Sequence, residues 1–133
     1  MCKQIKIRTY STKRDGQKSN KDRGLLSIIE SGKDVPFKIK RVFYIYGSKS
    51  KERGGHRHKK TVQALICVSG EYTIFVDDGK QSQTVILNSP EQCLIVDTKD
   101  WHTLTAKNAV SVLLVLASEH YDANDYADEK QHK

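Results

Sequence analysis

The sequence predicts an all-β domain, a sandwich or barrel of short strands. From Leu25 onward, short apolar runs are separated by turn residues at intervals of about ten residues. This spacing is typical of all-β sandwiches and barrels, whose short strands are joined by tight turns. Strands are therefore predicted at residues 25–29, 37–46, 62–68, 72–76, 84–87, 93–96 and 112–117.

Turn residues between these runs support the assignment. Residues 77–80 (DDGK) contain the Asp-Gly pair of a tight hairpin, which joins the predicted strands 72–76 and 84–87. Residues 69–70 (SG) and 88–90 (NSP) predict further turns. The only helix that we expect is the short acidic stretch 123–130.

The N-terminal segment is predicted to form an arm. Residues 4–10 resemble a strand, and the polar residues 13–23 hold no large apolar side chain, which indicates a long exposed loop. Ile5 and Ile7 give the strand an apolar face, which is most easily buried when the strand joins a sheet of its own chain or of a partner. We therefore expect one domain over residues 1–133, with this arm, a short acidic C-terminal tail and a homodimeric assembly.

Composition excludes several classes of protein. The 133 residues carry 23 Lys and Arg against 16 Asp and Glu, a net charge of +7. The longest apolar run, 112–117, is far shorter than the roughly 20 residues of a membrane span, and the N-terminus lacks the apolar stretch of a signal peptide. Three scattered cysteines without a Cys-x-x-Cys pair indicate reduced thiols. We therefore expect a cytoplasmic protein with no membrane association.

The positive charge is local. Residues 38–60 carry nine basic side chains and one acidic one, whereas residues 119–133 carry five acidic and two basic ones. The basic segment fits a nucleic-acid surface, a pocket for a phosphorylated small molecule, or an ordinary solvated face. It contains no ribonucleoprotein-type aromatic signature and no helix-turn-helix pattern, so nucleic acid is not the expected partner.

A histidine pair points to a functional site. His56 and His58 form a His-x-His unit, and residues i and i+2 of an extended chain project to the same face. Both imidazoles therefore converge on one pocket, although either could also be a satisfied, partly buried residue. Gln63 follows His58 after four residues and Gly70 after six more, and Trp101-His102 comes some 30 residues later.

This pattern resembles the two half-motifs of the cupin superfamily, which are small double-stranded jelly rolls. In metal-binding cupins a His-x-His pair, a Glu and a later His meet inside the barrel. Gln63 stands where those proteins have Glu, so the one anionic ligand is missing and we expect no metal and no cofactor. His58 and Gln63 are five residues apart, and a bulge between Lys59 and Val62 would bring them to the same face.

A second set of ordered matches runs from about residue 22 to residue 126. It comprises Asp22-Arg23-Gly24, Leu26, residues 35–37, 39–45 and 53–59, Gln63, Gly70, residues 76–79, Trp101-His102, residues 115–118, Tyr121-Asp122 and Asp125-Tyr126. These segments resemble the nucleotide-sugar 3,4-ketoisomerases that act on dTDP-4-keto-6-deoxyglucose. The resemblance implies a cupin-type jelly roll, a catalytic His-x-His pair, no required metal and a homodimer. Arg57 departs from the family pattern, which has a small residue there.

The implied reaction suits histidine chemistry. Moving a carbonyl from C4 to C3 of a hexose requires removal of the C3 proton, an enediol, and return of a proton to C4. Histidine has the right pKa for a base at neutral pH, so His56 and His58 are the expected catalytic pair. Tyr44, which lies in the predicted strand before them, is the expected proton donor or oxyanion partner. Tyr46 shares its strand face, and packing is the alternative role for both tyrosines.

The remaining expected site residues bind substrate. Arg53 precedes the histidine pair, and its guanidinium suits a diphosphate. For any of the basic candidates a solvated surface role is the alternative. The expected substrate-binding residues are Arg53, Tyr46, Lys59, Gln63, Trp101, His102 and Arg41.

Two other functions remain open at this point. A 3,5-epimerase of the same 4-keto sugar also begins by removing the C3 proton. A non-catalytic cupin that binds a sugar nucleotide or a metal would carry the same barrel. The sequence does not decide the configuration at C4 of the product.

Overall fold

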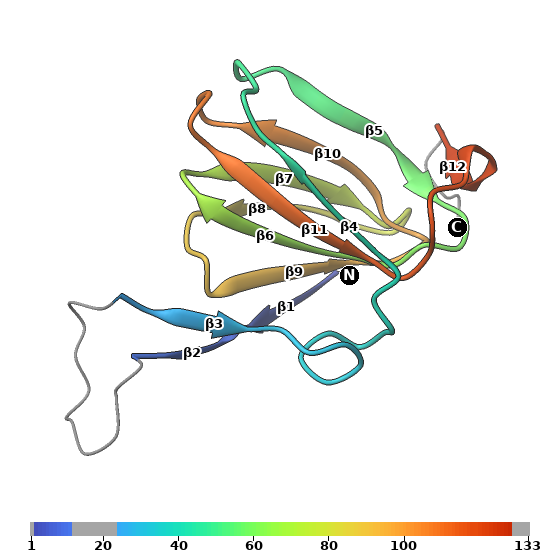
Figure 1. Cartoon of the computed structure of the whole chain (residues 1–133). Coiled ribbons are helices and arrows are strands. Elements are labelled where there is room, and N and C mark those ends of the chain that lie inside the picture. Colours follow the sequence, from blue (N-terminus) through green and yellow to red (C-terminus); the bar gives the residue numbers. More distant parts are fainter. Residues whose placement is uncertain (1, 12–23, 129–133) are drawn as a thin grey trace.

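Two antiparallel sheets of five strands each face one another in the computed structural model, which describes residues 2–11 and 24–128 (Figure 1). The strand order of the first sheet is β1 (Lys3–Lys6), β9 (Gln92–Val96), β6 (Gln63–Ser69), β11 (Val112–Ala117) and β4 (Arg41–Ile45). That of the second is β12 (Tyr126–Ala127), β5 (Glu52–His58), β10 (Trp101–Ala106), β7 (Tyr72–Asp77) and β8 (Ser82–Leu87). The predicted all-β jelly roll is confirmed.

The main core lies between the two sheets and explains the alternating strands. In β7 the side chains of Tyr72, Ile74 and Val76 are fully buried, while the residues between them are only partly buried. A strand with one face on the core produces this period of two. Inward-facing residues of β6, β8, β9, β10 and β11 complete the same cluster.

A second apolar cluster covers the outer face of the first sheet over β6, β9 and β11. Val35, Phe37 and Ile39, from the segment before β4, pack there against Ile66 and Leu116. Strand β6 is therefore buried on both faces, which is why residues 62–68 read as an almost continuous apolar run. The observed strand β4 is shorter than the predicted strand 37–46, because it begins only at Arg41. The residues before it belong to the segment that covers the sheet.

The N-terminal arm divides into two strands. β1 pairs with β9 of the same chain, and β2 (Arg8–Tyr10) pairs with β3 (Leu26–Ile28) in a separate two-stranded sheet that extends away from the barrel (Figure 1). Ile7, between β1 and β2, is 1% exposed in the second cluster. The apolar face of the arm is thus buried on its own chain, and the predicted loop 13–23 lies outside the described residues.

Three strands, β5, β10 and β12, were not predicted, and one predicted helix is wrong. β5 contains two glycines and five charged or histidine side chains, and half of β10 is threonine and alanine, so neither strand forms an apolar run. Over the described part of 123–130, Ala123–Asp125 form one 3₁₀ turn, η2, and β12 follows. The free edge of β5 provides hydrogen-bonding partners for that segment, which favours a strand over a helix.

The predicted hairpin at residues 77–80 is confirmed. Asp77 pairs with Ser82 where β7 meets β8, and the Asp78 carboxylate accepts hydrogen bonds from the backbone N–H groups of Lys80 and Gln81. Gly79 has φ of 90°, a conformation that favours glycine. Within the described residues, no helix is long and apolar enough to cross a membrane.

Candidate active site

Three histidines meet in a cavity of about 110 Å³ between the sheets. The ring centroid of His56 lies 5.2 Å from that of His58 and 5.3 Å from that of His102. His58 and His102 are nearly parallel, with centroids 5.9 Å apart. The remaining lining residues are Phe43, Ile45, Arg53, Gly54, Gln63, Leu104, Val115 and Tyr126.

A glycine bulge in β5 aligns the histidines. His102 pairs with His56, but Thr103 pairs with Gly54, so Gly55 is an extra residue in β5. Gly54 and Gly55 have φ of 89° and 77°, which L side chains rarely adopt. A Cβ on Gly54 would lie 2.8 Å from the carbonyl oxygen of His102, so only glycine lets the two strands approach this closely.

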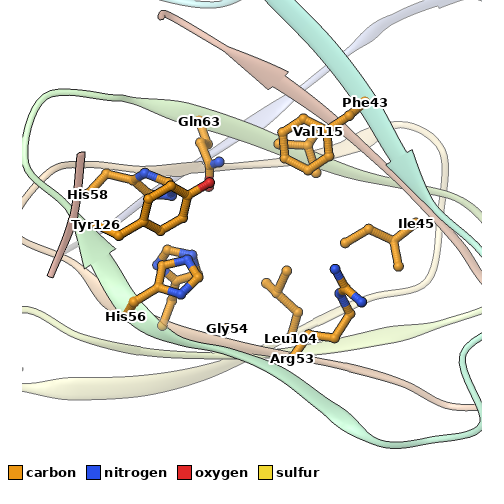
Figure 2. A pocket seen from close by; sticks show the side chains of 11 residues that line it. Phe43, Ile45, Arg53, Gly54, His56, His58, Gln63, Leu104, Val115 and Tyr126 are labelled. Atoms are coloured by element: carbon orange, nitrogen blue, oxygen red, sulfur yellow. The ribbon is translucent and has the colours of Figure 1, made fainter. Parts of the chain in front are cut away.

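Gln63 reaches the cavity without the predicted bulge. His58 ends β5 and Gln63 begins β6, so the two residues belong to different sheets and a loop over residues 59–62 separates them. Strand parity does not apply across a loop, and the expectation of a bulge between Lys59 and Val62 is wrong. The Gln63 side chain is 5% exposed and lines the cavity with the three histidines (Figure 2).

His58 is held by a buried carboxylate. Its Nδ1 lies 3.1 Å from Oδ2 of Asp125, and both side chains are at most 3% exposed. The same oxygen accepts a hydrogen bond from the Thr61 hydroxyl, and Oδ1 accepts one from the backbone N–H of Lys60 at 2.7 Å. Burial lowers the pKa of His58, and the hydrogen bond to Asp125 opposes that shift.

His102 and His56 are kept neutral by burial. His102 is 2% exposed, and burial lowers its pKa to about 4. Its Nδ1 lies 3.0 Å from the carbonyl oxygen of Asp100, so this nitrogen carries the proton and Nε2 is a free acceptor. Burial also lowers the pKa of His56. At neutral pH the site therefore contains uncharged imidazoles that can accept protons.

The C-terminal segment closes one side of the cavity. Tyr126 pairs with His58 across β12 and β5, and its ring centroid lies 4.7 Å from that of His58 and 4.8 Å from that of His56. Trp101 holds the next part of this segment, because its Nε1 donates to the carbonyl oxygen of Asp128 at 3.0 Å. Trp101 itself lies on the outer face of the second sheet, against Phe75, and does not line the cavity.

A basic residue lies at the opposite end of the cavity. Figure 2 shows Arg53 beside Ile45 and Leu104, away from the end where His56, His58 and Tyr126 gather. The cavity thus has a proton-transfer end and a cationic end. Arg41 does not line the cavity; its guanidinium carbon lies 5.2 Å from the centroid of Phe43, which does.

Several predicted site residues lie elsewhere. Strand alternation in β4 turns Phe43 and Ile45 toward the cavity and Tyr44 outward, where it is 62% exposed. Tyr46 is 70% exposed and packs beside Tyr44, with ring centroids 5.8 Å apart. The expectation that these tyrosines enter the pocket is therefore wrong for the cavity of their own chain. Lys59 is exposed, and neither it nor Arg57 lines the cavity.

Two residues with direct contacts to the histidines were missed as site residues. Tyr126 and Asp125 both belong to the segments that carry the family resemblance, and this was the available signal. Their acidic, polar surroundings predicted an exposed tail instead. The tyrosine beside the histidine pair is thus Tyr126 and not Tyr44.

The three histidines could also hold a metal ion. One ligand nitrogen from each lies within 4.8 Å of the others. His58 and His102 present Nε2, since Nδ1 of each is engaged by Asp125 or by the Asp100 carbonyl. Second partners of this kind are common behind metal-ligating histidines. Gln63 adds a neutral amide in place of an anionic ligand.

Comparisons with known proteins identify the family. The family model described as "FdtA: WxcM-like, C-terminal" matches residues 7–132. This chain belongs to that family. It is 44% identical over 105 residues, covering 78% of this chain and 76% of the relative, to a TDP-4-oxo-6-deoxy-alpha-D-glucose-3,4-oxoisomerase of Aneurinibacillus thermoaerophilus.

Solved structures agree with this assignment. The WlaRB TDP-quinovose 3,4-ketoisomerase of Campylobacter jejuni has a TM-score of 0.85 and 36% identity, over 96% of this chain and 92% of that one. A variant of the QdtA 3,4-ketoisomerase of Thermoanaerobacterium thermosaccharolyticum, in complex with TDP-4-keto-6-deoxyglucose, has a TM-score of 0.84 and 35% identity, over 96% and 87%. The resemblance inferred from the sequence is confirmed.

Structures of 3,5-epimerases share only the fold. The dTDP-4-dehydrorhamnose 3,5-epimerase of Bacillus anthracis has a TM-score of 0.77 at 16% identity, over 95% of this chain and 77% of that one. This likeness shows the fold alone, and the relatives of 35% identity or more are 3,4-ketoisomerases.

We predict that acid weakens the fold through His102. Its pKa is about 4 in the folded protein and about 6.5 when unfolded, so the unfolded chain binds the extra proton between these values. The contribution of neutral His102 to the free energy of unfolding is therefore fully present above about pH 6.5. It falls by about 3 kcal/mol toward pH 4, which urea denaturation at a series of pH values should show. In His102→Gln the free energy of unfolding should depend less steeply on pH, and the dependence that remains comes from the other histidines. Identical slopes would contradict the assignment.

Proposed function

We propose that this protein is a TDP-sugar 3,4-ketoisomerase that converts dTDP-4-keto-6-deoxyglucose to a dTDP-3-keto-6-deoxyhexose, in the biosynthesis of unusual deoxy sugars. The observation that carries the proposal is the set of uncharged histidines at one end of the cavity between the sheets, in a chain of the FdtA family. An isomerase of this kind needs no external electron acceptor. It needs bases and acids, and the side chains that line the cavity are suited to both roles.

The geometry supports a proton-transfer route along one edge of the sugar. A histidine of the pair His56 and His58 removes the C3 proton, which the C4 ketone acidifies, while O4 receives a proton and an enediol forms. C4 then receives a proton and the O3 hydroxyl loses one, which leaves the carbonyl at C3. Tyr126, beside both imidazoles, is suited to donate to the developing oxyanion at O4.

Substrate binding follows the polarity of the cavity. Arg53, at the end away from the histidines, is placed to bind the diphosphate, and Gln63 and His102 to contact the sugar. Arg41 is a further candidate for the diphosphate from beside Phe43. The basic segment thus serves a small phosphorylated substrate and not nucleic acid. The three cysteines are free thiols, which suits the cytoplasm.

Turnover in heavy water tests the reaction. We predict that deuterium appears at C4 of a 3-keto product made from dTDP-4-keto-6-deoxyglucose, while the C5 hydrogen is retained. The reason is that carbonyl migration involves only C3 and C4. Proton NMR of the product measures both positions, and it also gives the configuration at C4. Deuterium at C5 with the ketone still at C4 would identify an epimerase, and binding without any exchange would identify a non-catalytic protein.

Chelation tests whether the histidines act as acids and bases or as ligands. We predict unchanged turnover after prolonged treatment with EDTA, because Gln63 replaces the anionic ligand of metal-binding cupins. Elemental analysis of the same sample measures any remaining metal. Loss of activity that a divalent ion restores would instead make His56, His58 and His102 a metal site.

We further propose a homodimer through the outer face of β4. Val42 and Tyr44 lie on β4, the edge strand of the first sheet, and Tyr46 directly follows it. They are 57%, 62% and 70% exposed and form an apolar patch that a second copy would cover. Sedimentation velocity at micromolar concentration should show a dimer, and Tyr44→Glu should shift it to monomer. Ile86→Glu, at a residue 50% exposed on β8 of the other sheet, is the matched control and should leave the dimer intact. A monomeric wild type would contradict the proposal.

A further inference from the structure

One buried ionisable group beside the reacting cavity has no part in the proton-transfer route above. Asp125 is 4% exposed, lies on the 3₁₀ turn before Tyr126, and is 67 residues from His58 in the sequence. Its carboxylate nevertheless lies 3.1 Å from Nδ1 of that histidine. A buried carboxylate with an imidazole partner is energetically costly unless further donors satisfy it.

We propose that Asp125 is a positioning residue for His58: it fixes the Nδ1–H tautomer, leaves Nε2 free toward the cavity, and stabilises the imidazolium that forms when Nε2 takes a proton. This inference rests on the proposed function and adds a division of roles among the three histidines. Asp125 touches no substrate and acts only through the imidazole.

The hydrogen-bond pattern sets the tautomer. An ionised carboxylate only accepts hydrogen bonds, so Nδ1 of His58 must be the donor and Nε2 the acceptor. Burial raises the pKa of Asp125, but hydrogen bonds from Thr61, from the Lys60 N–H and from His58 outweigh it and leave the pKa below its usual value. The carboxylate therefore stays charged, and it does not take the proton from the imidazole.

The turn that carries Asp125 is fixed at several points. The Asp125 N–H donates to the carbonyl oxygen of Asp122 at 3.0 Å, and its own carbonyl oxygen accepts from the Lys59 N–H at 2.7 Å. The next residue, Tyr126, pairs with His58 itself. Backbone contacts therefore hold turn η2 against the end of β5 and the loop after it, and this fixes the distance between the carboxylate and Nδ1.

His58 is distinguished from the other two histidines by this contact. Nδ1 of His102 donates to a neutral carbonyl, and its ring, with a pKa of about 4, is poorly suited to hold a proton at neutral pH. Among the described residues, the hydrogen bond between an imidazole and a carboxylate is made by His58. The structure thus makes His58 the ring that can hold the migrating proton. The titratable and charged groups that face it are His56, His102, Arg41, Tyr126 and Asp125.

Replacing the carboxylate by its neutral isostere tests the inference. In Asp125→Asn the imidazolium loses its anionic partner, so kcat should fall by roughly 10²-fold or more, with a smaller change in KM. The acid limb of the kcat/KM pH profile should move to lower pH, because the pKa of His58 falls. A merely structural role would lower the rate and leave the acid limb in place.

Asp122→Asn is the matched control. Asp122 lies in the same turn and loses the same charge, but its carboxylate pairs with Lys60 and with the Asn124 N–H, and not with a histidine. Asparagine retains the capping hydrogen bond at the start of the turn. This variant should keep the kcat and the pH profile of the wild type.

NMR of the histidine rings keeps this test separate from the test of the enzyme activity. In the wild type, the 15N shifts of His58 should show the Nδ1–H tautomer, and in Asp125→Asn its titration should move to lower pH. An Nε2–H tautomer, or an unmoved titration in the folded variant, would overturn the inference even in an active enzyme. If the wild type lacks ketoisomerase turnover, the proposed function fails, and the NMR result alone decides whether Asp125 governs the protonation of His58. The wild-type tautomer needs no variant and decides the case if Asp125→Asn does not fold.

Discussion

The close pairing of β5 with β10 is the constraint on which the site depends. Gly54 has no side chain to hold the strands apart, and the extra residue at Gly55 sets the register that places His56 opposite His102. Any Cβ at position 54 would meet the carbonyl oxygen of His102 before the strands closed. The close pairing of the two backbones therefore brings the His-x-His pair on β5 next to His102 on β10 and forms one wall of the cavity.

Burial then gives these histidines their chemistry. Desolvation disfavours the charged imidazolium and lowers the pKa of all three rings, most clearly for His102. A neutral imidazole at physiological pH can remove a proton, but the imidazolium that forms must then be stabilised. At His58 the Asp125 carboxylate provides this stabilisation. Burial thus acts on all three histidines of the cavity, and the carboxylate of Asp125 acts on His58.

The barrel itself does not specify the reaction. A 3,5-epimerase shares this fold at 16% identity, and both reactions begin with proton removal at C3 of a 4-keto sugar. The difference must lie in which side chains face C4 and C5 after the first step. In this chain the imidazoles and Tyr126 gather at one end of the cavity, and Arg53 lies at the other.

The sequence by itself determined the class of fold, the hairpin at residues 77–80, the His-x-His pair and the family, because turns, alternation and short motifs are set by neighbouring residues. The tertiary structure decided which face of β4 enters the cavity and which tyrosine reaches the histidines. It placed Tyr126 there and left Tyr44 outside. It also brought Asp125 to His58 across 67 residues. Such contacts depend on how strand edges pair and on what the sheets bury, and no local pattern in the chain encodes them.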